Sequence, residues 1–138
     1  MTGQVRQFDQ LNLGERATLT RCYAEVDISE WGRLAATHEP AFGVPEPLIA
    51  AMFSNLLGEE LPGHGTNYLK QSMVFHGQAQ PDETLTAEAT VVRLRPEKAL
   101  VNLETVCRSD DGRLICEGEA LVLFNPQAAV NSPPSSSR

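Results

Sequence analysis

The residues of this chain that are best suited to acid–base chemistry lie close together, at His38, Glu39 and Glu46. A carboxylate next to apolar groups has its pKa raised by desolvation, which is the usual route to a general base. Glu46 precedes Pro47 at an expected helix start, where the helix macrodipole acts in the opposite sense and favours the ionised form. A structural interpretation stands beside the catalytic one. Glu46 is then an ordinary helix-start carboxylate, and His38 and Glu39 are exposed in a proline-rich loop.

The helix expected to begin near Pro47 would also supply hydrogen-bond donors. Its first N–H groups, on Leu48, Ile49 and Ala50, could polarise a carbonyl oxygen, as helix N-termini do for oxyanions. Pro47 has no N–H and cannot share this role.

This helix carries a broad apolar face. Apolar residues recur at four-residue spacing in two adjacent rows, and Gly58 is a plausible end point. Such a face is expected of a helix that is wrapped by a sheet. The two rows are Leu48, Met52 and Leu56, and Ile49, Phe53 and Leu57.

The rest of the chain is dominated by strand patterns. A short helix is expected after a cap at Asp27 or Ser29, and Asp111-Gly112 favours a hairpin turn. This order predicts an α+β domain with helices on one face of an antiparallel sheet. Alternating or β-rich segments predict strands over residues 17–26, 65–76, 83–94, 98–108 and 113–124.

The most specific motif follows the apolar helix and reads GEELPGHGTNYLKQS over residues 58–72. It resembles the pattern G-x-x-L-P-G-x-G-(T/S)-x-Y-L-x-Q-S of the MaoC-like (R)-specific enoyl-CoA hydratases. The resemblance implies a hotdog fold, in which a long antiparallel sheet wraps around a central helix. It also implies that the ligand is an acyl thioester of CoA or acyl-carrier protein. Tyr68, Gln71 and Ser72 would lie alongside its tunnel, although a strand with one buried face explains them equally well.

The catalytic motif of that family, D-x-N-P-x-H, is not preserved here. Pro40 matches its proline, whereas Thr37, Glu39 and Phe42 stand where the Asp, Asn and His belong. The spacer before the central helix is also shortened. We therefore expect a rearranged active site with Glu39, His38 and Glu46 as acid–base candidates. The shorter spacer would open the pocket to an unusual acyl group.

Length and charge limit the remaining possibilities. The 138 residues suit one domain over residues 1–125, followed by a Pro- and Ser-rich tail over 126–138 that we expect to be disordered. A net charge of −7 argues against nucleic-acid binding, which requires a basic surface. No apolar run is long enough to span a membrane, and no signal region opens the sequence.

The cysteines and the absent motifs complete the picture. Cys22, Cys107 and Cys116 are an odd number without metal-ligand spacing, and we expect them to be small buried hydrophobes in a reduced, cytoplasmic protein. The sequence has no phosphate-binding loop, dinucleotide fingerprint or zinc spacing, so we expect no cofactor and no metal.

Three functions remain open from the sequence. The first is a hydratase or dehydratase that acts on an acyl thioester through a rearranged site. The second is a hotdog acyl-CoA thioesterase, which needs only one Glu or Asp near the central helix. The third is a non-catalytic subunit of a heteromeric hydratase. The resemblance implies a homodimer or a higher oligomer, or a heteromer in the third case.

Overall fold

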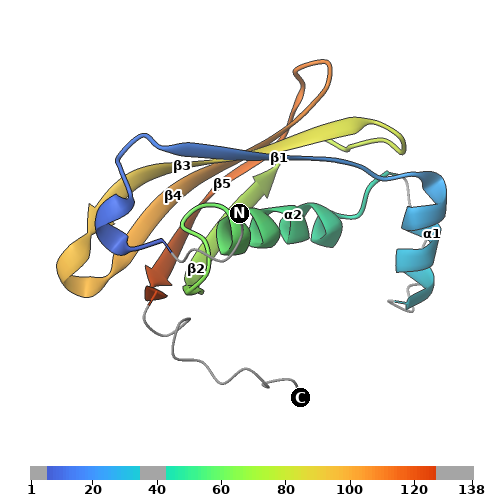
Figure 1. Cartoon of the computed structure of the whole chain (residues 1–138). Coiled ribbons are helices and arrows are strands. Elements are labelled where there is room, and N and C mark those ends of the chain that lie inside the picture. Colours follow the sequence, from blue (N-terminus) through green and yellow to red (C-terminus); the bar gives the residue numbers. More distant parts are fainter. Residues whose placement is uncertain (1–5, 35–42, 127–138) are drawn as a thin grey trace.

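The computed structural model describes residues 6–34 and 43–126, in which one antiparallel sheet curves around a central helix (Figure 1). The helices are α1 (Glu25–Leu34) and α2 (Glu46–Glu59), with short 3₁₀ turns η1 (Phe8–Gln10) and η2 (Pro96–Lys98). The strands are β1 (Arg16–Cys22), β2 (Thr66–Phe75), β3 (Thr84–Arg95), β4 (Leu100–Ser109) and β5 (Leu114–Phe124).

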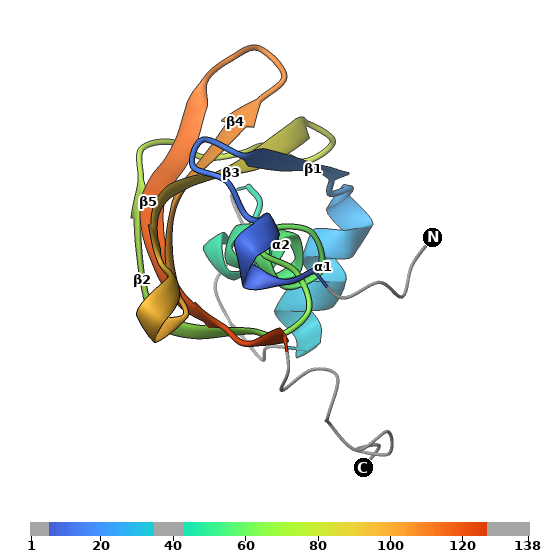
Figure 2. The ribbon, with the colours of Figure 1, turned by 60° about the vertical axis from the view of Figure 1, so that its left-hand side comes forward.

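The spatial order of the strands is β1-β3-β4-β5-β2, and all neighbours are antiparallel. The two edge strands, β1 and β2, are therefore joined by the segment that contains both helices. Seen nearly along α2, the sheet wraps around the helix (Figure 2). This arrangement confirms the α+β hotdog fold that the sequence predicted.

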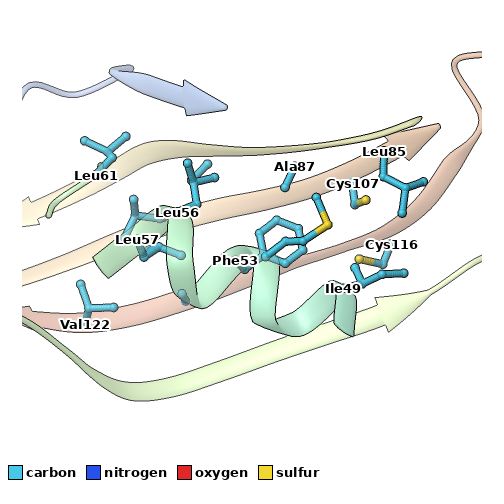
Figure 3. Packing of buried hydrophobic residues seen from close by; sticks show 14 of the residues in the cluster. Ile49, Phe53, Leu56, Leu57, Leu61, Leu85, Ala87, Cys107, Cys116 and Val122 are labelled. Carbon is cyan, nitrogen blue, oxygen red and sulfur yellow. The ribbon is translucent and has the colours of Figure 1, made fainter. Parts of the chain in front are cut away.

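Helix α2 fills the concave side of the sheet because its two apolar rows are buried there. Phe53 and Leu57 are fully buried in this core (Figure 3). The helix begins at Glu46, with Pro45 as its N-cap and Pro47 in the first turn. It continues past the expected end point, Gly58, and closes when the Glu60 N–H donates to the Leu56 carbonyl at 2.9 Å.

The helix lies mainly against β3 and β1. The helix-facing residues of β3 are fully buried, whereas β2 is largely exposed along its length. The helix-facing side of β2 is consequently the open side of the core. The buried residues of β3 are Leu85, Ala87, Ala89 and Val91.

Two sequence expectations near the N-terminus were wrong. The strand expected over 17–26 ends at Cys22, and helix α1 begins at Glu25, before both expected caps, Asp27 and Ser29. The Asp27 carboxylate accepts the Ala24 N–H at 2.9 Å, which stabilises a helix start before Ser29. Cys22 is exposed, because the edge strand β1 leaves it uncovered, whereas Cys107 and Cys116 are buried as expected.

Candidate functional site

The N-terminus of α2 lies at the end of the sheet where β2 and β4 finish and β3 and β5 begin. Figure 3 shows Cys107 and Cys116 on the strands beside the Ile49 end of the helix. Burial raises the pKa of the Cys116 thiol to about 12, with smaller contributions from Cys107 and from the Glu46 carboxylate. Glu46 is exposed, whereas both thiols are fully buried in the core.

The segment that enters α2 is clamped to the loop between β2 and β3. The Val44 N–H donates to the Ala79 carbonyl at 2.7 Å. Gly43 has φ +128°, and a Cβ there would lie 2.6 Å from the Ala79 oxygen. Only glycine fits both the backbone angle and the close approach. Gly43 therefore sets the position from which the first turn of α2 starts.

The expected oxyanion donors are only partly available. The Leu48 N–H donates to the Pro45 carbonyl at 3.0 Å, which closes the first turn of the helix. Ile49 and Ala50 come after the first turn, where N–H groups normally enter the helical ladder. The positive end of the helix dipole still points at the site, whereas the Leu48 N–H already has an acceptor.

His38 and Glu39 lie outside the described residues, in the segment that joins α1 to α2. Their role in the site stays a prediction. Of the three expected acid–base residues, only Glu46 is placed by the structure, and it stands at the first position of α2.

The three expected contact residues of β2 do not share one face. Tyr68 and Gln71 pair with the buried residues Val122 and Ala120 of β5, so both face α2. Ser72 pairs with Glu119 on the outer side of the sheet. Gln71 is exposed and has no hydrogen-bond partner within residues 6–34 and 43–126.

The hydroxyl of Tyr68 is already used to hold the helix. It donates to the Phe53 carbonyl at 3.2 Å. Burial raises the pKa of Tyr68, and a hydrogen bond with Ser54 acts in the opposite direction. A contact between Tyr68 and a ligand stays a prediction.

Sequence reasoning missed Tyr23, which follows β1. Its hydroxyl donates to the Leu48 carbonyl at 3.4 Å, close to the expected oxyanion end of α2. Its pKa is raised, chiefly by burial, while Arg21 acts in the opposite sense. A half-buried tyrosine usually finds a partner for its hydroxyl, but the sequence does not say which one.

The comparisons with known proteins agree with this architecture. No family model matches the chain. The chain is 32% identical over 126 residues to the (R)-specific enoyl-CoA hydratase of Aeromonas caviae, a match that covers 81% of this chain and 94% of that protein. It is also 32% identical over 130 residues to the (R)-specific enoyl-CoA hydratase of Rhodospirillum rubrum, covering 84% of this chain and 90% of that protein.

The chain belongs to the (R)-specific enoyl-CoA hydratase family. The solved structure of the (R)-hydratase from A. caviae, described as involved in PHA biosynthesis, superposes with a TM-score of 0.78 at 29% identity. That match covers 83% of this chain and 98% of the other.

Within the described part of this hydratase-family chain, no histidine adjoins the N-terminus of α2. His64 Nε2 lies 3.4 Å from Glu59 Oε1 at the opposite end of the helix. His76 Nε2 lies 2.9 Å from Glu117 Oε2, which is on the outer side of the sheet. Both histidines are exposed. The positions that replace the family's Asp and His, Thr37 and Phe42, lie outside the described residues.

Three carboxylates lie close together outside the helix end, near the β4–β5 turn. Carboxylate oxygens of Glu83, Asp110 and Asp111 lie within 4.8 Å of one another. Arg113 lies 3.0 Å from Glu83 and 3.2 Å from Asp111, so it already supplies a counter-charge. These groups therefore form an exposed ion-pair network beside the β4–β5 turn.

No helix among the described residues has both the length and the apolar character needed to cross a membrane.

Proposed function

We propose that this protein adds water reversibly to the double bond of an enoyl thioester, carried by CoA or an acyl-carrier protein, at the N-terminus of α2. The observation that carries the proposal is the family relationship, 32% identity over a match covering 81% of the chain. The N-terminus of α2 supports the proposal, since it combines the Glu46 carboxylate, the apolar core beneath it and the positive end of the helix dipole.

The proposed reaction needs one base and one site for negative charge. The base takes a proton from water while the water oxygen bonds to the β-carbon of the thioester. The C=C electron pair moves towards the thioester oxygen, and a proton then returns to the α-carbon. Glu46, Glu39 and His38 are the proposed acid–base groups. A carboxylate that accepts the proton becomes neutral as the oxyanion forms, so it does not repel the new charge.

The proposed ligand path runs along the open, helix-facing side of β2. Gln71 is exposed there and its amide has no partner among the described residues, while Met73 and Phe75 are half-buried on the same face. A pantetheine arm contains amides that a glutamine side chain can bind. We further propose that the short spacer before α2 leaves room for an unusual acyl group.

We also propose that a second copy of the chain covers the edge of the sheet at β2. This strand is a long edge with unpaired backbone groups, and it exposes Leu69 by 55% and Val74 by 56%. Antiparallel pairing of β2 with its counterpart would satisfy these groups and close the open side of the site. Sedimentation should show a dimer that Leu69→Asp dissociates. Leu13→Asp, which changes another leucine that is 65% exposed, should not. A monomeric wild type, or an L69D variant that sediments like wild type, would rule this interface out.

One observation is also compatible with two alternative functions. Because no described histidine adjoins the helix end, a single carboxylate could instead support thioester hydrolysis. A partner chain in a heteromer could equally bring the missing Asp and His.

The test is incubation of the purified protein with enoyl-, 3-hydroxyacyl- and saturated acyl-CoAs, with products followed by mass spectrometry. Gain or loss of one water supports the proposal. Release of free CoA favours the thioesterase. Binding without turnover, together with activity restored by a co-purified chain, favours the subunit.

A further inference from the structure

Tyr23 connects three segments that meet at the N-terminus of α2. It lies between β1 and α1, and its hydroxyl donates to the Leu48 carbonyl at 3.4 Å. Its own carbonyl accepts the Asp82 N–H at 2.8 Å, which ties it to the loop between β2 and β3. That same loop holds the start of α2 through the Val44–Ala79 bond. Tyr23 thus links the edge strand β1 to the start of α2 and to the loop between β2 and β3.

The geometry points to Tyr23 as a positioning residue for the hydration proposed above, on which this inference rests. By binding the Leu48 carbonyl, it fixes the first turns of α2 and hence the direction of the helix dipole and of Glu46. Leu48 is held on both sides, since its N–H donates to the Pro45 carbonyl. Among the described residues, the hydroxyl makes its hydrogen bond to the backbone of the helix, so Tyr23 acts through α2.

The surroundings of Tyr23 keep its hydroxyl a donor. Burial raises its pKa above the usual value, and Cys107 and Asp27 add to this, against an opposing effect of Arg21. The hydroxyl is therefore protonated at neutral pH. At 3.4 Å the bond is longer than the usual 2.7–2.8 Å for hydroxyl donors. Hydrogen bonds at catalytic sites are often long without substrate and shorten in the complex.

The chain contains a matched control in Tyr68. Tyr68 makes the same kind of bond from the opposite edge of the sheet, to the Phe53 carbonyl at 3.2 Å. Phe53 lies beyond the first turn, on the part of α2 that faces the core. Both tyrosines hold the helix, but only Tyr23 holds the end that carries the proposed chemistry.

The experiment compares Tyr23→Phe with Tyr68→Phe, each of which removes one hydroxyl and keeps the ring. Loss of one intramolecular hydrogen bond should lower Tm by about 2–5 °C in both variants. For Y23F, kcat for enoyl-CoA hydration should fall roughly 3- to 10-fold with KM changed less than about twofold. For Y68F, which changes a residue expected to contact the ligand, the effect should fall mainly on KM, with a smaller change in kcat than in Y23F. Equal effects on kcat in the two variants, or a Y23F effect confined to KM, would overturn the positioning role.

A second readout does not depend on activity. Backbone hydrogen exchange of the Leu48 to Met52 amides should be several-fold faster in Y23F and unchanged in Y68F. Unchanged exchange in Y23F would show that the Tyr23–Leu48 hydrogen bond does not hold the start of α2. If wild type turns over no thioester but Y23F still shows faster exchange, the proposed function is wrong, whereas the structural role of this hydrogen bond is confirmed.

Discussion

The two ends of helix α2 differ in the contacts that hold them and in whether a sequence motif marks them. The C-terminal end is closed by a turn in which the Gly63 N–H donates to the Leu57 carbonyl and Thr66 Oγ1 donates to the Gly63 carbonyl. The N-terminal end is held from a distance, by Tyr23 and by Ala79. The family motif over residues 58–72 forms the first end, whereas the proposed chemistry lies at the second. A motif that identifies a family can therefore form a turn that ends a helix, far from the atoms that react.

The largest expected difference between the two ends is catalytic. Glu46→Gln should lower kcat for hydration by about 10²- to 10⁴-fold, the usual effect of losing a general acid or base. Glu60→Gln, which changes another exposed glutamate at the far end of α2, should leave kcat unchanged. Steady-state kinetics on both variants decide this. Full activity in E46Q would transfer the acid–base role to Glu39 or His38, to be tested by E39Q and His38→Ala.

A second difference concerns the glycines that allow close backbone contact at each end. A Cβ at Gly43 would lie 2.6 Å from the Ala79 oxygen, and a Cβ at Gly65 would lie 2.7 Å from the Asn125 oxygen. Both also have positive φ, so Gly43→Ala and Gly65→Ala should each reduce the free energy of unfolding by about 1–4 kcal/mol.

Activity should separate these two glycine variants. G43A should also lower kcat, because the start of α2 moves, whereas folded G65A should keep wild-type kcat. Urea unfolding and kinetics on the same preparations provide the check. If G65A lost more kcat than G43A, the proposed chemistry would have to lie near the C-terminal end of α2 instead of the N-terminal end.

The thiols under the N-terminal end predict a dependence on alkaline pH. Burial raises the pKa of Cys107 to about 11 and of Cys116 to about 12, from an ordinary value of 9.0. Since the folded pKa values are raised, the contribution to stability is complete below about pH 9 and is lost as the pH rises through about 11–12. Unfolding by urea should show a decline of several kcal/mol across this window, since each pKa unit corresponds to about 1.4 kcal/mol.

Cysteine variants test the source of that decline. The double variant Cys107→Ala, Cys116→Ala should show a flatter pH dependence, whatever its stability at neutral pH. Cys22→Ala, which removes the exposed thiol, should keep the wild-type slope. An unchanged slope in the double variant would assign the alkaline decline to other groups.

The smallest effect is expected at His64, the histidine inside the family motif. Its Nε2 lies 3.4 Å from Glu59, and both side chains are mostly exposed. Exposed ion pairs contribute little, so His64→Ala should change the free energy of unfolding by less than about 1 kcal/mol and leave kcat unchanged. A large loss of kcat in this variant would place chemistry at the C-terminal end after all.

The fold was predictable because its signals are local and periodic. The apolar rows predicted α2, and the strand patterns predicted β2 to β5 to within about two residues. The start of α1 was missed because it depends on a single side-chain contact by Asp27. The exposure of Cys22 was missed because the sequence does not say which strands lie at the edges of the sheet.

The site was less predictable because its contacts are tertiary. Tyr23 and the Leu48 carbonyl are 25 residues apart in the chain, and no periodicity links them. The acceptor of the Leu48 N–H, the Pro45 carbonyl, depends on how tightly the first turn closes. The faces of Tyr68, Gln71 and Ser72 depend on the irregular register between β2 and β5 near Tyr68.

The most direct test of the account is turnover of an enoyl-CoA in water labelled with oxygen-18, with the products identified by mass spectrometry. The account predicts one labelled oxygen in a 3-hydroxyacyl-CoA, with no free CoA, and loss of this product in E46Q but not in E60Q. Free CoA with the label in a released carboxylate, or no product at all from the purified protein, would contradict it.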